Sequence, residues 1–476
     1  MKELKVYISN TDPNLLKSIG GRPGELIRLI RSNEYISEPA LENQLFEGKW
    51  KHQNFLNLKT QTKRILSAYF LISSPKKNSE TLKKMKLCRR HFFTAKHFIE
   101  LSNRKEAKKL LQKAFKIASA YSFTDLAHGC IMELMNDAAL EGKTKKFNEY
   151  EKIESQLHDD LLAERLVRRV YYKATLFMNF KRKVQDCISK ELVHQLRQSP
   201  CSSVLFLQLS HVIRIIYHIN ETNYHAVTEV ADMAFQKLVN RKGSYDSHLH
   251  FFLKVRAVAH IALSQHSEAK QLLLNAEQYS PARSYNMAIL RYYQAINCLH
   301  SGDYAGAYQL YRQQRHTRFE VLRRQWLVMS PYLYFLKQVN RLQTGQDRFS
   351  LGKYLNETTS MAHDKSGENI NILIGELLVQ MLRDRGKFID RMEAVQMYSY
   401  RYLQGPETRR AKWFLRILCM LPRADFQPNA IRQIAKPQID LLKQQPISMG
   451  NNLSVELIPF MDLLEMLMGQ LQVRIA

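Results

Sequence analysis

Apolar residues recur at helical spacing along most of the chain. In the segment 105–121 they fall on one side and lysines fall on the other, the apolar set being Ala107, Leu110, Leu111, Ala114, Phe115, Ala118 and Tyr121. Such a stripe is typical of an amphipathic helix that buries one face. No segment shows sustained alternation of apolar and polar residues with hairpin turns between, so the pattern predicts an all-α fold.

A three-part pattern, a helix, a short polar break and a second helix with a small residue near its start, recurs along the chain. It is clearest over 295–311 and is repeated over 262–269 and 101–107. The intervals between matching positions are 38 residues from Ala269 to Ala307, 43 from Ala226 to Ala269 and 40 from Ala107 to Phe147. Helix pairs that recur at such intervals predict an irregular α-solenoid of antiparallel helix pairs.

The small residues of these units resemble the tetratricopeptide-repeat (TPR) superfamily, in a divergent form. The residues that carry the resemblance are those that let two helices pack closely or turn between them: Ala95, Ala107, Ala114, Ala257, Ala269, Ala276, Gly302, Tyr304 and Ala307. The chain departs from the family at Gln314, where a small residue is expected, and in its longer intervals. The resemblance implies a TPR-like solenoid.

The distribution of helix-breaking residues predicts three parts. Residues 1–75 form an N-terminal head with three short helices in 12–74, residues 79–420 form the helical repeats, and residues 421–476 form a C-terminal helical cap. The last helix is expected over 454–472, where it would cover the open apolar end of the array. The head is interpreted either as a capping bundle or as a helix-turn-helix-like unit.

Positive charge is concentrated near the front of the chain. The net charge is +27, and residues 51–118 hold 18 Lys or Arg residues against three acids. A field of that sign attracts phosphates, acidic proteins or anionic surfaces. If the head is helix-turn-helix-like, the helix from residue 54 would enter the major groove. The candidate nucleic-acid contacts are Asn54, Asn57, Lys59, Gln61, Lys63, Arg64, Lys83, Lys84, Arg89 and Arg90.

No motif points to catalysis, a metal or a cofactor. The six cysteines stand far apart, which fits neither a disulfide framework nor paired zinc ligands. His211, His218 and His225 are too widely spaced on a helix to share an ion, and His248 with His250 would do so only outside a helix. Glu149, Glu151 and Glu154 are expected on a solvated helical face. We therefore expect a protein that is not an enzyme and has no cofactor.

Two functions follow from this sequence. The first is a scaffold whose helical repeats bind a protein or peptide partner, with Tyr292, Tyr293, Tyr332 and Tyr334 as candidates to line a groove. The second is a nucleic-acid-binding protein, similar to a transcription regulator, that uses the basic region 51–118. The first residues lack the apolar stretch of a signal peptide, and no apolar run has the length of a membrane span. We expect a cytoplasmic protein with no membrane span.

Overall fold

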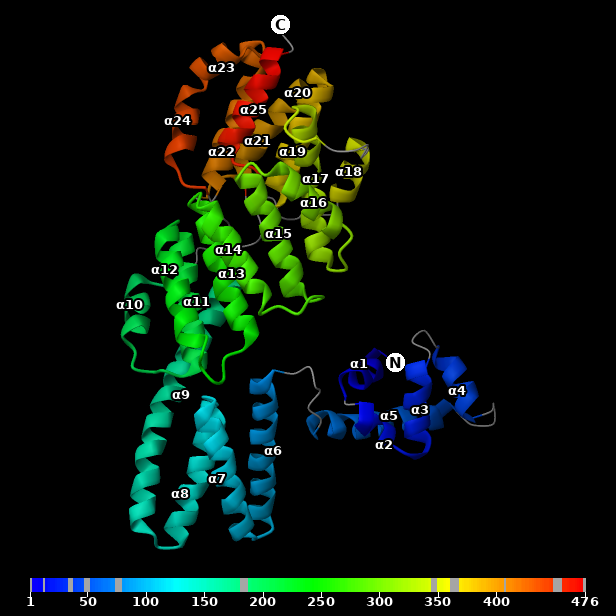
Figure 1. The fold of residues 1–476 in the computed structure, drawn as a ribbon, viewed down its shortest axis with the longest axis vertical. Helices are drawn as coiled ribbons and strands as arrows, with labels where there is room; N and C mark the ends of the chain where they lie inside the picture. Colours follow the sequence, from blue (N-terminus) through cyan, green and yellow to red (C-terminus); the bar gives the residue numbers. More distant parts are fainter. Residues whose placement is uncertain are drawn as a thin grey trace. The chain divides into compact units, whose positions relative to one another are not determined.

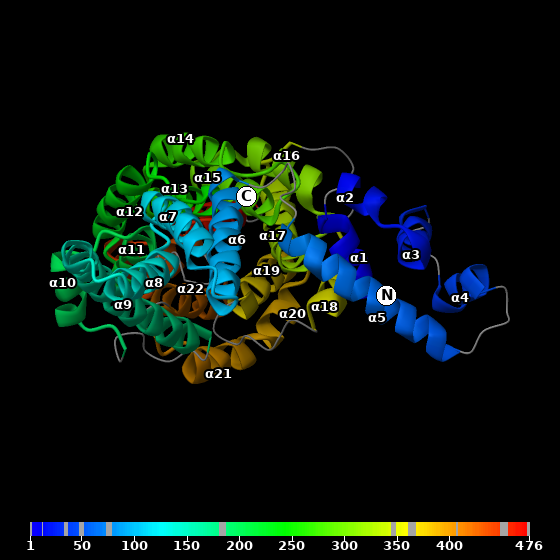
Figure 2. The ribbon, with the colours of Figure 1, turned by 90° about the horizontal axis from the view of Figure 1, so that it is seen from below.

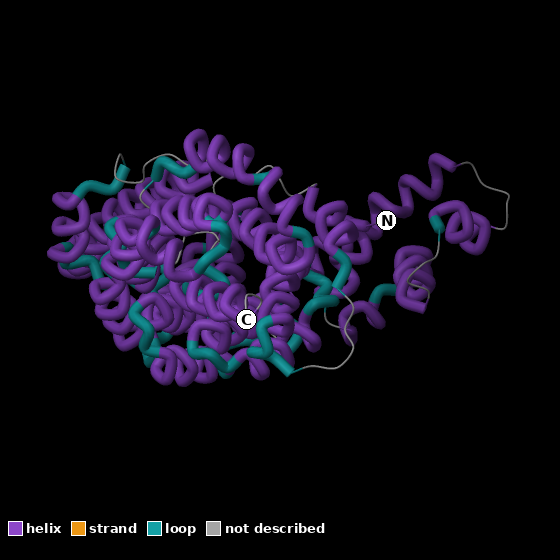
Figure 3. Tube along the Cα trace, turned by 90° about the horizontal axis from the view of Figure 1, so that it is seen from above, coloured by secondary structure: helices purple, strands orange, loops and turns teal. Residues whose placement is uncertain are grey.

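The structure of the chain is a computed structural model. The described residues are 2–11, 13–32, 37–46, 52–72, 79–179, 187–343, 349–359, 368–405, 408–447 and 456–473. Their regular structure is helical throughout, and the ranges just given contain no strand (Figure 3). The prediction of an all-α fold is confirmed.

The chain divides into two compact units. The first consists of Met1–Glu164 with Arg241–Tyr245, and the second of Arg165–Asn240 with Asp246–Ala476. The predicted head, 1–75, and the start of the predicted repeats therefore both belong to the first unit. The boundaries expected at residues 75 and 420 stay predictions.

Five helices form the N-terminal bundle of the first unit. They are α1 (Lys2–Asn10), α2 (Pro13–Ser18), α3 (Gly21–Ser32), α4 (Glu38–Phe46) and α5 (His52–Ile72). Leu26, Leu41, Phe55 and Leu66 lie in one buried cluster at its centre. The helices expected in 12–74 correspond to α3, α4 and α5, and the structure adds the short helices α1 and α2. Their nine and six residues are too few to show a clear apolar stripe in the sequence.

The rest of the first unit is built from long antiparallel helices. These are α6 (Glu80–Glu100), α7 (Arg104–Ala120), α8 (Thr124–Leu140) and the beginning of α9 (Thr144–Asn179), which run alternately up and down in Figure 1. Ala95, Ala107 and Ala114 are buried where α6 meets α7. A methyl side chain at each of these positions lets the two backbones approach closely.

In the second unit, most helices pack against their neighbours in sequence. The first of them are α10 (Lys190–Gln198), α11 (Val204–Asn220), α12 (Tyr224–Leu238), α13 (Asp246–Ala262), α14 (His266–Glu277), α15 (Tyr285–His300), α16 (Tyr304–Gln314) and α17 (Glu320–Gln338). Contacts follow the chain from α10 to α17, as Figures 1 and 2 show. Ala257, Ala269, Ala276 and Ala307 are fully buried in this series. The arrangement is a solenoid-like series of helix pairs.

Seven of the turns in the two units share one backbone conformation. In each of these turns a residue with left-handed φ follows the end of the first helix, at Ser102, Ser122, Gly142, Thr222, Ser264, Gly302 and Asn340. At six of the seven, the next N–H donates to the carbonyl five residues earlier, as from Asn103 to Phe98 at 2.8 Å. This is the Schellman ending of a helix. At all but Asn340, the next helix begins two residues after the left-handed residue, so a single residue separates the end of one helix motif from the start of the next helix.

The number of residues between these turns gives the length of the repeat in the structure. The interval is 40 residues from Ser102 to Gly142, 42 from Thr222 to Ser264, 38 from Ser264 to Gly302 and 38 from Gly302 to Asn340. The Gly302-Asp303-Tyr304 pattern in the sequence is one such turn. Gly302 supplies the left-handed φ of 81°, and the Asp303 side chain caps α16 by accepting from the Gly306 N–H at 2.9 Å.

The chain ends in a second group of helices within the same unit. They are α18 (Leu351–Thr359), α19 (Glu368–Arg383), α20 (Arg385–Asp390), α21 (Met392–Tyr402), α22 (Arg409–Met420), α23 (Pro428–Ile434), α24 (Lys436–Gln444) and α25 (Phe460–Val473). The last helix begins at Phe460 rather than at 454. The residues before it, 456–459, are not helical, and 454–455 lie outside the described residues.

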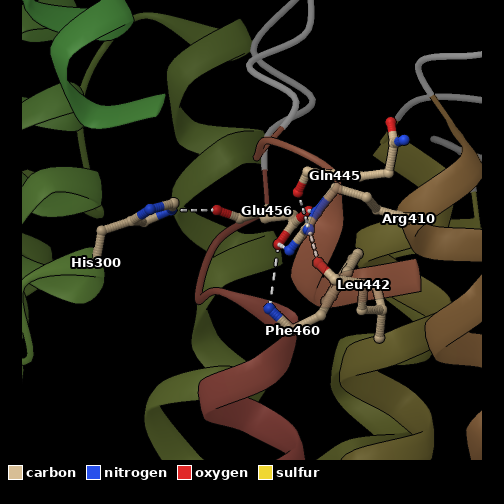
Figure 4. A network of polar contacts seen from close by, with 6 residues as sticks. All are labelled: His300, Arg410, Leu442, Gln445, Glu456 and Phe460. Carbon is tan, nitrogen blue, oxygen red and sulfur yellow. Dashed lines mark hydrogen bonds and ion pairs between the residues drawn. The ribbon is translucent and has the colours of Figure 1, made fainter. Parts of the chain in front are cut away.

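A buried polar network holds the segment that precedes α25. Glu456 receives hydrogen bonds from Arg410, from the Phe460 N–H at 3.1 Å and, through its backbone carbonyl, from His300 Nε2 at 2.6 Å (Figure 4). Arg410 also donates to the carbonyls of Leu442 and Gln445. These contacts link α15, α22 and the end of α24 to the C-terminal segment.

Candidate functional site

Two of the predicted base-reading residues of α5 lie beside carboxylates. Lys59 Nζ is 2.8 Å from Glu38 Oε2 and lies over the Phe55 ring, while Lys63 Nζ is 2.8 Å from Glu3 Oε1. The hydrogen bond from Lys59 holds the pKa of Glu38 below its usual value, and the one to Glu3 raises the pKa of Lys63. Both lysines are therefore already partnered by acids of the same bundle.

The first turns of α5 carry a second acidic neighbour. His52 Nδ1 is 2.9 Å from Glu42 Oε2, so α4 places two carboxylates, Glu38 and Glu42, against the half of α5 that would face DNA. Negative charge at that place opposes the approach of phosphates. Asn57, Gln61 and Arg64 are exposed and Asn54 is half-buried. Most of the turn between the helices, 47–51, lies outside the described residues, and the helix-turn-helix interpretation stays a prediction.

The other predicted contacts lie on α6. Lys83, Arg89 and Arg90 are exposed, and Lys84 is half-buried. Four further cations on α7 resemble them, because they are exposed and make no ion pair within the described residues: Arg104, Lys105, Lys113 and Lys116. We call these eight residues on α6 and α7 the basic surface. Three other lysines of these helices are paired with acids: Lys96 with Glu133, Lys108 with Asp137 and Glu141, and Lys109 with Glu106.

The lysines of α7 face away from its buried side. Lys105, Lys113 and Lys116 stand at i, i+8 and i+11, which places them on one side of the helix. Ala107, Leu111, Ala114 and Ala118 form the opposite, buried side. On α6, Phe93 is 63% exposed and follows Arg89 and Arg90 by one turn. An exposed ring among cations can stack on a nucleic-acid base.

Two turns of the second unit and the neighbouring helix ends border an open cationic cavity of about 600 Å³. Its lining includes Arg283, Ser284, Arg318 and Phe319 from the turns α14–α15 and α16–α17, and Arg291 from α15. Arg318 donates to the Arg283 carbonyl at 2.6 Å and lies over the Phe319 ring, whereas Arg291 is paired with Glu277 at 2.8 Å. Arg283 makes no ion pair in the described part of the chain. The cavity therefore suits a carboxylate or another anion.

The tyrosines expected to line a groove serve mostly as core. Tyr292 and Tyr332 are fully buried, and Tyr293 is 7% exposed. Tyr332 donates to the Asn371 carbonyl at 3.0 Å, and burial raises its pKa. Only Tyr334 is half-buried, with the Arg383 guanidinium 4.6 Å from its ring. Arg283 and Arg318 could not be predicted from the sequence, since a lone Arg in a turn carries no recognisable pattern.

Reactive side chains of the described residues are held in unreactive forms. Burial raises the pKa of Cys88 to about 11 and of Cys130 to about 12, so both thiols stay protonated. His248 and His250 stand on helix α13, where i and i+2 do not face each other. His250 Nδ1 is instead 2.8 Å from Ser280 Oγ. These groups offer no activated nucleophile.

Comparisons with known proteins add no relative. No family model, no curated protein and no solved structure matches the chain. Among the described helices, none combines the length and the apolarity that crossing a membrane requires.

Proposed function

We propose that this chain is a non-enzymatic, TPR-like scaffold of the cytoplasm that binds a protein or peptide partner. The observation that carries the proposal is the series of helix pairs joined by one recurring turn, at intervals of 38 to 42 residues between Thr222 and Asn340. Solenoids of this kind present extended surfaces built from many helices. Such surfaces bind partners by shape and charge rather than by a deep reaction pocket.

The cavity between the α14–α15 and α16–α17 turns is the surface that best suits such a partner. Arg283 and Arg318 offer guanidinium groups, which recognise carboxylates with two parallel hydrogen bonds. Phe319 and the stem of Met287 add apolar surface beside them. An acidic peptide with an apolar anchor matches this lining. The net charge of +27 favours the same choice, because it attracts acidic partners over long distances.

The test is a direct binding measurement on the full chain. The immobilised protein is used to capture partners from its native lysate with and without nuclease treatment, and each purified partner is then titrated by calorimetry. We expect Arg283→Glu with Arg318→Glu to weaken binding by roughly tenfold or more, since two charge-assisted contacts are reversed. A matched control is Arg416→Glu with Arg423→Glu, two exposed arginines elsewhere in the second unit. Equal affinities for both double variants would contradict the use of this cavity.

Loss of every captured partner after nuclease treatment would contradict the scaffold proposal itself and favour the second candidate, nucleic-acid binding. The basic surface of α6 and α7, with the exposed Phe93 ring, is the observation that favours it. Contacts to phosphates release counterions, so affinity for single- or double-stranded nucleic acid would fall steeply with salt.

The second candidate is tested with charge-reversal variants of the full chain. Lys105→Glu, Lys113→Glu and Lys116→Glu together should abolish binding at low salt if α7 contacts phosphates. Lys145→Glu, Lys146→Glu and Lys152→Glu form the matched control, because these lysines are also exposed but stand on α9. Identical behaviour of the two triple variants, or no binding of the unaltered chain at low salt, would remove this candidate.

A further inference from the structure

Two histidines and a glutamate meet between α8 and α9 in the first unit. His128 belongs to α8, and Glu154 and His158 belong to α9. One ligand atom from each of the three side chains lies within 4.8 Å of the others. His128 Nε2 is 3.0 Å from Glu154 Oε1, and the His128 and His158 ring centroids are 6.2 Å apart.

The fold brings these groups together through two independent constraints. Glu154 and His158 are four residues apart, so they share one side of α9 one turn apart. The antiparallel helix α8 then places His128 opposite them. Buried residues fix α8 from its other side, among them Ala127, Cys130 and Ile131. A second link between the same helices is the hydrogen bond from Thr124 Oγ1 to Glu164 Oε1 at 2.6 Å.

The ligand types and their spacing match a first-row transition metal. Zn²⁺ takes imidazole nitrogen and carboxylate oxygen at about 2.0–2.2 Å, and two histidines with one glutamate form a known three-ligand set that leaves the fourth position open. In a tetrahedral site the ligand atoms lie roughly 3.3 Å apart. The present separations need only small rotations of side chains that are half-buried or, at His158, exposed.

The electrostatic surroundings favour a cation at this place. Residues 125–164 contain ten acids and four lysines, in contrast to the basic helices α6 and α7. Three of those acids, Glu133, Asp137 and Glu141, form ion pairs with lysines, whereas within the described residues Glu154 pairs with His128 alone. A divalent ion would compensate this local excess of negative charge.

We propose that His128, Glu154 and His158 bind one Zn²⁺ ion, with a fourth position open to water or to a ligand from outside the chain. The ion crosslinks the antiparallel helices α8 and α9. Because it binds only the folded chain, it stabilises the first unit by mass action. A plain ion pair between His128 and Glu154 would account for two of the three groups. It gives no role to His158, which stands one turn beyond Glu154 on the same side of α9.

The experiment uses the full chain without a histidine tag, freed of metal by a chelator that is then removed. ZnCl₂ is titrated by calorimetry, and CoCl₂ is added separately because tetrahedral Co²⁺ gives intense visible absorption. We expect one Zn²⁺ per chain, a rise in the melting temperature on adding zinc, and Co²⁺ bands without a thiolate contribution. His158→Ala should weaken zinc binding by roughly tenfold or more and remove the Co²⁺ bands, because a ligand is lost.

The control is His97→Ala, since His97 is an exposed histidine on α6 that is paired with Glu100 at 3.3 Å. It should bind zinc as the unaltered chain does. Because His158 is exposed, its replacement leaves the core intact, and a circular dichroism spectrum verifies this. Zinc binding that is unchanged in His158→Ala, Co²⁺ bands of thiolate type, or no zinc bound by the unaltered chain would each overturn the proposal.

Discussion

Arg410 and Glu456 form a two-point ion pair inside the second unit, with side chains that are 7% and 5% exposed. Arg410 Nη2 is 3.2 Å from Glu456 Oε2, and Arg410 Nε donates to the other carboxylate oxygen. The same carboxylate receives the Phe460 N–H at the start of α25. The pair therefore fixes the C-terminal segment to α22, and every charge in it has a partner.

Removing one member of this pair leaves a buried charge without compensation. We expect Arg410→Met to lower the free energy of unfolding by about 3–5 kcal/mol. The matched control is Arg432→Met, which breaks the exposed pair with Glu465 at 3.1 Å and should cost about 0–1 kcal/mol. Denaturant unfolding followed by circular dichroism measures both. Similar losses in the two variants would show that the Arg410 pair is not isolated from water.

Substitutions at two equivalent left-handed turn positions should change the free energy of unfolding in opposite directions. Thr222 has a φ of 54° and carries a branched side chain, so Thr222→Gly should raise the free energy of unfolding by about 1 kcal/mol. Gly302 has a φ of 81° and nothing within 4 Å of an added Cβ, so Gly302→Ala should lower it by about 1 kcal/mol through backbone strain alone. Thermal unfolding of the two variants checks the signs.

Gly469 provides the control for this pair. It lies within helix α25, also with nothing within 4 Å of an added Cβ. Gly469→Ala should therefore stabilise the protein by about 1 kcal/mol through helix propensity. If Gly302→Ala were stabilising as well, the turn would not need the left-handed conformation.

The small residues of the repeat predict intolerance of larger side chains. Ala269 is 0% exposed between packed helices, and Ala269→Leu adds atoms for which no space exists. We expect a loss of about 1–3 kcal/mol. Ala139→Leu, on the exposed side of α8, should change the free energy of unfolding by less than about 0.5 kcal/mol. A tolerated leucine at Ala269 would mean that these helices are not closely packed there.

The turns and the small residues could be predicted because each leaves a local mark in the sequence. Gly302-Asp303 is both a helix ending and a cap, and alanines at helical spacing indicate a close helix contact. The same turn at Ser264 and Thr222 carries no glycine, so only the structure shows that its conformation recurs. Local pattern thus reveals elements and their order.

The interacting side chains could not be predicted in the same way. Lys59 meets Glu38 from 21 positions away, and this contact places acids beside the residues expected to face DNA. His128 meets Glu154 from 26 positions away, and nothing near Glu154 distinguishes it from Glu149 or Glu151. Contacts between separate helices depend on their rotation about their axes, which one sequence determines only through packing of the whole unit.

Buried histidines make the stability of the second unit depend on pH. Burial lowers the pKa of His300 from 6.5 to about 4, although its hydrogen bond to the Glu456 carbonyl acts in the opposite direction. Burial lowers the pKa of His211 and of His250 to about 4 as well. The unfolded chain binds more protons than the folded chain between these values. The contribution of these histidines to the free energy of unfolding is therefore fully present above about pH 6.5 and decreases as the pH falls towards about 4.

His300→Gln tests the contribution of one such group. The Gln amide can still donate to the Glu456 carbonyl, which His300 Nε2 reaches at 2.6 Å, but it does not titrate. We expect a smaller fall in melting temperature between about pH 7.5 and about pH 5 than for the unaltered chain, because one proton fewer is taken up on unfolding. Circular dichroism melts at both pH values measure this difference. If the melting temperature fell by the same amount in both proteins, His300 would be protonated to the same extent in the folded and unfolded states. Its full burial argues against that result.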